Sequence, residues 1–107
     1  MKRGEVYWVR FDPAVGGEIQ KTRPAVIVSN DQANKYLNRV QVVPITSQTD
    51  KVYPSEALIT VQDKRCKAAA DQIRTVAKTR LQEKLAEVTP EQMHRIEQAI
   101  RIQLGLK

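Results

Sequence analysis

The chain has 107 residues and a mass of 12.2 kDa, which allows one domain with one hydrophobic core. Its composition, 41% hydrophobic and 28% charged, is that of a globular protein and excludes a disordered chain. The 18 lysines and arginines exceed the 12 acidic residues, and the net charge of +6 favours a polyanionic partner. We therefore expect a single basic domain over residues 1–107.

The cysteine content and the N-terminus bear on the compartment. Cys66 is the only cysteine, so an internal disulfide is excluded and a reducing cytoplasm is expected. No His or Cys lies at metal-ligand spacing from it, and we expect no metal and no cofactor. Gly4 and Glu5 stand where a signal peptide would become apolar, and no segment approaches the roughly 20 apolar residues of a membrane span. The sequence predicts a soluble, cytoplasmic protein.

The N-terminal segment predicts a strand followed by a polar loop. Glu5 to Phe11 is rich in β-branched and aromatic residues and ends at an Asp-Pro turn signal. Trp8 within it is interpreted as a core or dimer-contact residue rather than a surface for base stacking. Ala14 to Thr22 is a glycine-bearing loop of the kind that often grips ligands. Glu18 in this loop is either a solvated carboxylate or a general base.

Two apolar runs carry the first indication of a site. Pro24 cannot donate to a ladder and begins a strand over Ala25–Val28 that is expected to be buried on both faces. A second strand, Arg39–Ile45, ends in two hydroxyl residues, Thr46 and Ser47. We expect the ends of the two strands to meet and to place Arg23 beside these hydroxyls. A guanidinium and hydroxyls suit an RNA phosphate.

The middle of the chain predicts short strands joined by turns. Gln82 to Val88 fits both a strand and a helix stripe. The other expected elements are a helical turn with a loop over Asp31–Asn38, a strand over Ser55–Val61, a charged turn over Gln62–Lys67, two strand segments meeting near Asp71 within Ala68–Val76, and a helical turn over Lys78–Leu81.

The C-terminus predicts an amphipathic helix. Thr89 is the N-cap, Pro90 occupies N1 and Gln92 at N3 completes a capping box. Gly105 ends the helix. The expected apolar stripe consists of Met93, Ile96, Ile100 and Leu104. Many short strands and one such helix favour a small curled sheet or barrel whose open side the helix closes.

Five segments in register resemble the MazF/PemK family of toxin endoribonucleases. The resemblance runs from near residue 3 to Leu106. It is carried by Arg3–Val9, Phe11–Pro13, Arg23–Ser29, Pro44–Ser47 and Asp71–Val76. It implies a mainly β fold with a C-terminal helix, an SH3-like small barrel of the MazF/PemK/CcdB type, and it favours a strand over Gln82–Val88. It also implies a homodimer, metal-independent cleavage of single-stranded RNA, mRNA above all, at short sequence motifs, and neutralisation by a cognate antitoxin.

The resemblance also assigns site residues. The catalytic arginine of the family matches Arg23 and its catalytic hydroxyl matches Thr46, while Glu18 matches a loop acid that some members carry. Thr22 stands where some relatives have histidine, so Glu18 or an arginine-activated water is the candidate base. The residues expected to bind RNA are Gln20, Lys21, Thr22, Ser47, Gln48, Gln72 and Arg74.

Two other functions compete with RNA cleavage. A toxin of the same fold that poisons a topoisomerase is expected to lack the paired arginine and threonine. A plain nucleic-acid-binding barrel would show salt-dependent binding without product.

Overall fold

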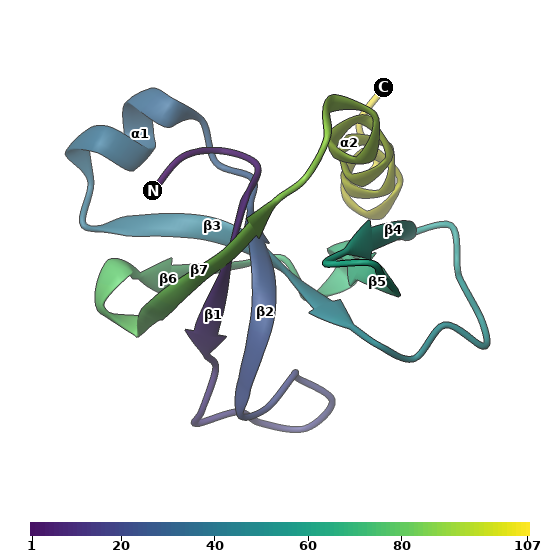
Figure 1. The fold of residues 1–107 in the computed structure, drawn as a ribbon, viewed down its shortest axis with the longest axis horizontal. Helices are drawn as coiled ribbons and strands as arrows, with labels where there is room; N and C mark the ends of the chain where they lie inside the picture. Colours follow the sequence, from purple (N-terminus) through teal and green to yellow (C-terminus); the bar gives the residue numbers. More distant parts are fainter.

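The computed structural model describes residues 1–107, which form one curled antiparallel sheet covered at one side by a helix (Figure 1). The strands are β1 (Glu5–Arg10), β2 (Thr22–Ile27), β3 (Arg39–Thr46), β4 (Glu56–Val61), β5 (Lys64–Ala69), β6 (Arg74–Ala77) and β7 (Leu81–Glu87). The helices are α1 (Asp31–Tyr36) and α2 (Pro90–Leu104), with 3₁₀ turns at Ala70–Gln72 and Lys78–Arg80. Neither helix combines the length and the apolar character that crossing a bilayer requires.

The sheet is organised around the long strand β3. Its order is β4-β5-β3-β2-β1-β7, and β6 pairs with the N-terminal half of β3 on the edge whose C-terminal half pairs with β5. All pairings are antiparallel. The mainly β fold with a C-terminal helix, expected from the sequence, is confirmed, and the sheet curls into a half-barrel.

The two faces of the sheet pack into two separate cores, because successive side chains of a strand point to opposite faces. The barrel core lies inside the curl and contains Val9, Phe11, Ala25, Ile27, Val40, Val42 and Val76. The helix-side core lies between the sheet and α2 and includes Val6, Val26, Val43, Ile45, Ile59, Met93 and Ile96. β2 supplies both cores, which explains its continuous apolar run.

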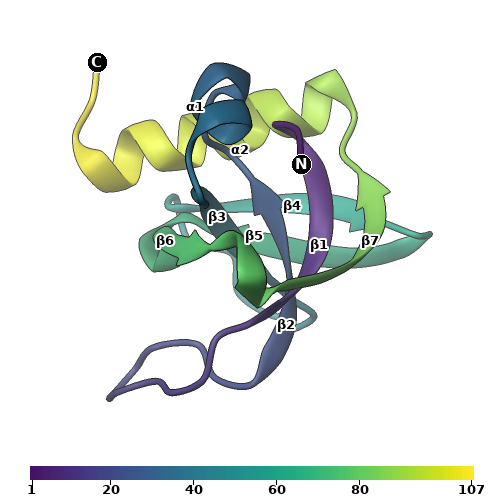
Figure 2. The ribbon, with the colours of Figure 1, turned by 90° about the vertical axis from the view of Figure 1, so that its left-hand side faces the viewer.

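The C-terminal helix begins as its sequence predicts. The Thr89 hydroxyl accepts from the backbone N–H of Gln92, the Gln92 side chain accepts from the backbone N–H of Thr89, and Gly105 ends the helix at a φ of 68°. The predicted stripe is wrong at its last member, because Leu104 is 53% exposed. Figure 2 shows the reason: the last turns of α2 extend beyond the sheet, so no strand lies beneath them.

The predicted charged turn over Gln62–Lys67 is also wrong. Only Gln62 and Asp63 form the turn, both with positive φ, and Lys64 already pairs with Val61 as the first residue of β5. Positive φ at both central residues gives a two-residue hairpin the twist of its strands. The sequence did not predict the start of β5 because its first two residues, Lys64 and Arg65, are basic and exposed.

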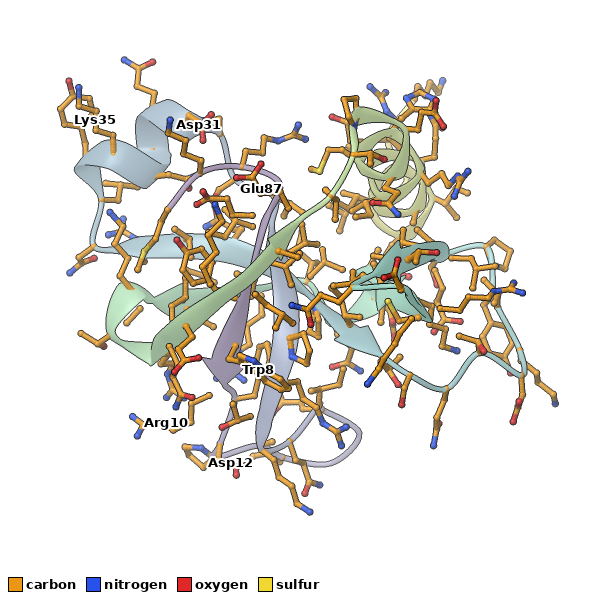
Figure 3. All side chains as sticks on the ribbon, in the orientation of Figure 1. Trp8, Arg10, Asp12, Asp31, Lys35 and Glu87 are labelled. Carbon is orange, nitrogen blue, oxygen red and sulfur yellow. The ribbon has the colours of Figure 1, made fainter.

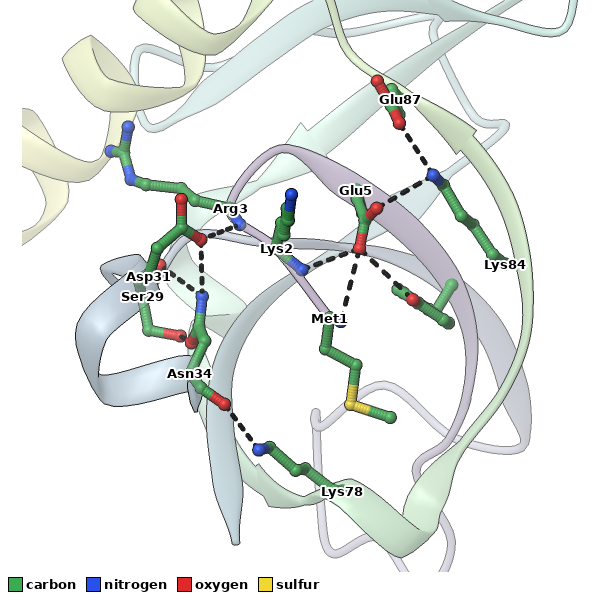
Figure 4. Close-up of polar contacts among 11 residues, drawn as sticks. Met1, Lys2, Arg3, Glu5, Ser29, Asp31, Asn34, Lys78, Lys84 and Glu87 are labelled. Atoms are coloured by element: carbon green, nitrogen blue, oxygen red, sulfur yellow. Dashed lines mark hydrogen bonds and ion pairs between the residues drawn. The ribbon is translucent and has the colours of Figure 1, made fainter. Parts of the chain in front are cut away.

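A cluster of charges fastens the N-terminus to β7 (Figure 4). The Glu5 carboxylate accepts from the backbone N–H of Lys2 at 2.6 Å and from the Tyr7 hydroxyl at 3.2 Å, and it lies 2.8 Å from Nζ of Lys84. Burial alone would raise the pKa of Glu5, but the hydrogen bonds from Lys84 and Lys2 and the charge of Lys84 outweigh it and lower the pKa from 4.5 to about 2.

We expect Glu5→Gln to destabilise the protein at pH 7. Because the folded-state pKa is lowered, the carboxylate contributes stability above pH 4.5 and loses it between pH 4.5 and about 2. The loss at pH 7 should be about 1 to 2 kcal/mol, less than the full linkage value because Lys84 is 41% exposed. Urea unfolding at several pH values measures the difference, which should vanish near pH 2. Glu83→Gln, at an exposed position of β7, the strand that carries Lys84, is the control, and an equal loss there would contradict the role of Glu5.

Candidate active site

Arg23 and Thr46 lie opposite each other where β2 begins and β3 ends. The ladder between these strands finishes with Ala25 opposite Pro44. Continuing the antiparallel register by two residues along each strand brings Arg23 opposite Thr46. Both residues line one hollow with a volume of about 380 Å³. The structure thus brings together the two residues that the sequence places at the strand ends.

The Arg23 side chain is exposed and carries no carboxylate partner. Its Nε donates to the backbone carbonyl of Gln20 at 3.4 Å, and this is its one hydrogen bond to the protein. Asp12, an acidic residue at the start of the β1–β2 loop, is engaged elsewhere, because its carboxylate accepts from the backbone N–H of Lys21 at 2.8 Å. The terminal nitrogens of the Arg23 guanidinium are therefore available to an anion from solution.

The Thr46 hydroxyl is half-buried and keeps its own proton available. Its Oγ1 accepts from the backbone N–H of Gln48 at 3.3 Å. A hydroxyl has one donor in addition to its acceptor sites. The hydroxyl can therefore donate a hydrogen bond to a group held in the hollow while the Gln48 amide fixes its position.

The loop between β1 and β2 forms the other wall of the hollow. Glu18 is exposed, and its carboxylate accepts from the backbone N–H of Val15 at 2.7 Å, which closes the tip of the loop. Glu18 also lines an adjacent hollow of about 560 Å³, so it stands between the two. In this arrangement the carboxylate shapes the loop and faces both hollows.

Most of the residues expected to bind RNA line the hollow of Arg23 and Thr46. Thr22 does not line it, since it lies on the other side of the β2 end and faces a third hollow. The residues in the hollow are Gln20, Lys21, Ser47 and Gln48.

Gln72 and Arg74 line the adjacent hollow, and their polar groups contact the protein itself. The Gln72 amide donates to the carbonyl of Gly17 and accepts from the backbone N–H of Ile19, both at 3.2 Å. Arg74 donates to the carbonyl of Phe11 at 3.2 Å. These contacts hold both ends of the β1–β2 loop, which the sequence did not indicate because the bonded segments lie far apart along the chain.

Lys67 is a structural residue that the sequence analysis missed. It stands opposite Thr46 in the pairing of β3 with β5, and its side chain is only 10% exposed. Its Nζ donates to the carbonyl of Lys51 at 2.7 Å and pairs with Glu56 at 3.0 Å. The bond to the Lys51 carbonyl fastens the segment after Gln48 to the β4–β5 hairpin, and the pair with Glu56 joins the two strands of that hairpin.

Comparison with known proteins identifies the family of the chain. Residues 2–104 match the family described as PemK-like, MazF-like toxin of type II toxin–antitoxin systems. The chain is 39% identical to endoribonuclease MazF9 of Mycobacterium tuberculosis, with 99% of this chain and 98% of that protein covered. It is also 39% identical to endoribonuclease MazF of Staphylococcus saprophyticus, with 99% and 92% covered.

A solved structure of a mycobacterial endoribonuclease in complex with its cognate antitoxin superposes with a TM-score of 0.85. It is 30% identical in sequence, and the match covers 100% of this chain and 97% of that one. The chain belongs to the PemK/MazF family of toxins of type II toxin–antitoxin systems. The resemblance stated from the sequence is therefore confirmed.

Proposed function

We propose that this protein is a cytoplasmic endoribonuclease toxin that cleaves single-stranded RNA, mRNA above all, at short sequence motifs without a metal ion. The observation that carries the proposal is the placement of an unpaired Arg23 guanidinium and the Thr46 hydroxyl in one hollow at the paired ends of β2 and β3. The full-length relatives at 39% identity are named endoribonucleases, which agrees with the activity expected from the sequence.

The reaction is an attack by the 2′-hydroxyl of the RNA on its own neighbouring phosphate. The 2′-oxygen bonds to phosphorus as the bond to the 5′-oxygen breaks, which leaves a 2′,3′-cyclic phosphate and a 5′-hydroxyl. A base removes the 2′ proton, and the leaving 5′-oxygen gains one. Arg23 presents a planar fork of N–H donors to two phosphate oxygens and stabilises the charge that develops there. Thr46 donates to the same phosphate.

Glu18 is the protein group best placed to act as the base. It lines the hollow of Arg23 and Thr46, and no histidine does. Its carboxylate is bonded to the Val15 amide of its own loop, so it would reach the 2′-hydroxyl after that contact is exchanged. A water molecule held by Arg23 is the alternative base. The Arg23 guanidinium is a hydrogen-bond donor without an acceptor site and is therefore unsuited to act as the base.

The competing functions are less well supported. A topoisomerase poison of this fold does not need Arg23 and Thr46 in one hollow, and the family relatives that match are endoribonucleases. A barrel that only binds nucleic acid would explain the charge of +6 but not the unpaired guanidinium beside a hydroxyl.

The partners follow from the same charges. We infer that a cognate antitoxin neutralises the toxin by laying an acidic segment over Arg23, as the basic surface favours. The mycobacterial relative was solved with its cognate antitoxin, which agrees with this. We also infer a homodimer, in which the exposed apolar side chains of Ile102, Leu104 and Leu106 at the end of α2 become covered.

We expect Arg23→Ala to lower kcat/KM for RNA cleavage by about 10²–10³-fold, because one donor aimed at developing charge is worth that much. Folding should be unchanged, since the side chain is exposed and makes one long hydrogen bond. Cleavage of a long RNA in EDTA, with the cut ends mapped, measures the activity, and circular dichroism checks the fold. Arg39→Ala removes an exposed arginine from the other end of β3 and should leave cleavage intact. A folded Arg23→Ala protein that cuts at the normal rate would place the chemistry elsewhere.

A 2′-methoxy group at the cut site should block cleavage while binding persists. The modification removes the attacking oxygen's proton and leaves the phosphate contacts of Arg23 and Thr46 in place. Gel analysis of the products together with filter binding of the same oligonucleotide measures both properties. Unmodified RNA should end in a 2′,3′-cyclic phosphate and a 5′-hydroxyl. Scission of the modified oligonucleotide would rule out attack by the neighbouring 2′-hydroxyl.

A further inference from the structure

The third hollow, which Thr22 faces, lies on the opposite side of the β2 end from Thr46. It has a volume of about 300 Å³. Trp8, Pro24 and Ile45 form its floor, Leu85 of β7 stands at one side, and Lys64 and Arg65 of the β4–β5 hairpin stand at the other. It faces the same side of the sheet as the helix-side core but lies beyond the end of that core.

The floor of this hollow is fixed by strand pairing. Trp8 is opposite Pro24 in the ladder of β1 with β2, and continuing the β2–β3 register by one residue places Ile45 opposite Pro24. The hairpin wall is held in place as well, because the Gln62 side chain donates to the carbonyl of Leu85 at 3.1 Å. The hollow is therefore formed before any ligand arrives.

Trp8 is the most informative residue of the hollow. The sequence placed it in the core or in a dimer contact, yet it belongs to neither of the two cores and is half-buried. Figure 3 labels its side chain near β1 and β2. An indole that packs against no core cluster offers a flat apolar surface, and stacking on an aromatic ring is how proteins bind single-stranded bases.

The cations at the rim are unpaired. Lys64 and Arg65 are exposed, and neither makes a salt bridge or a side-chain hydrogen bond within the chain. Neighbouring Lys67, in contrast, is committed to Glu56. Two free cations beside an aromatic floor suit the phosphate and the base of one nucleotide.

The hollow is continuous with the candidate active site. Arg23, Ile45 and Ser47 line both, so an RNA strand whose phosphate lies at Arg23 can extend into this hollow. We propose that this hollow binds the nucleotide next to the scissile phosphate, with its base against the Trp8 indole and its far phosphate between Lys64 and Arg65. The proposal rests on the proposed RNA cleavage and assigns a base-selecting subsite to it.

Trp8 reports on this subsite directly, because it is the only tryptophan of the chain. Titration with a single-stranded RNA carrying 2′-methoxy groups throughout should quench or shift its fluorescence to saturation. Two shorter oligonucleotides, one extending only to the 5′ side of the cut and the other only to the 3′ side, should be compared. Only one of the two should reproduce the change in Trp8 fluorescence. An unchanged spectrum with RNA that filter binding shows to be bound would overturn the proposal. So would a Trp8 already shielded from acrylamide before RNA is added, since a second copy or another partner would then fill the hollow.

A charge variant provides an independent measurement that does not disturb the sheet. Lys64→Gln with Arg65→Gln should raise KM for a long RNA about tenfold and leave kcat near normal, since the phosphate at Arg23 is untouched. A dinucleotide that spans only the cut should be cleaved equally by the variant and the wild type. Lys35→Gln, on α1, is the matched control and should change neither constant. An unchanged KM in the double variant would contradict the subsite.

The two proposals fail in different ways. Quenching of Trp8 by RNA that is never cut would refute the nuclease activity and leave an RNA-binding hollow. Cleavage that depends on Arg23 but leaves Trp8 unaffected would preserve the nuclease and refute the subsite.

Discussion

The antiparallel pairing of β2 with β3 is the constraint on which the rest of the structure depends. A slip of one residue would turn every side chain of a strand to the opposite face. Here both faces are buried: Ala25 and Val42 lie in the barrel core, while Val26 and Val43 lie in the helix-side core. A slip of one residue would exchange the side chains of the two cores. The positions of Arg23 and Thr46, just beyond the last pair, are consequently set by packing well away from the site.

The polar groups around the site divide into those that hold its walls and those left free. Gln72 and Arg74 are bonded to the β1–β2 loop, and Lys67 is bonded to the carbonyl of Lys51 in the segment that follows Gln48 on the opposite side. Arg23 is free of carboxylate partners, as are Lys64 and Arg65 of the neighbouring hollow. A protein that fixes its loops with amides and buried pairs can leave its exposed cations for an anionic substrate, and a charge of +6 attracts such a substrate from a distance.

Sequence reasoning succeeded where the signal is local. The capping box of α2 and the apolar run of β2 each follow from neighbouring residues, and the structure has both. It failed where a distant partner decides the outcome. From the sequence Lys67 is assigned to a charged turn, whereas in the structure it pairs with Glu56. Leu104 continues the apolar stripe of α2 along the sequence, but it lies beyond the edge of the sheet and is exposed. Trp8 lies outside both cores because its surroundings come from β2, β5 and β7, and the dimer contact expected for it stays a prediction.

A double-mutant cycle of Arg23→Ala with Thr46→Val tests most directly whether the β2–β3 register makes one phosphate site. Thr46→Val keeps the shape of the side chain and removes only the hydroxyl. If both groups act on the same phosphate, the two losses in kcat/KM should be strongly non-additive, and the double variant should be little worse than Arg23→Ala alone. Losses that simply multiply in a folded double variant would show that the two residues act independently, and would contradict a shared site at the ends of these strands.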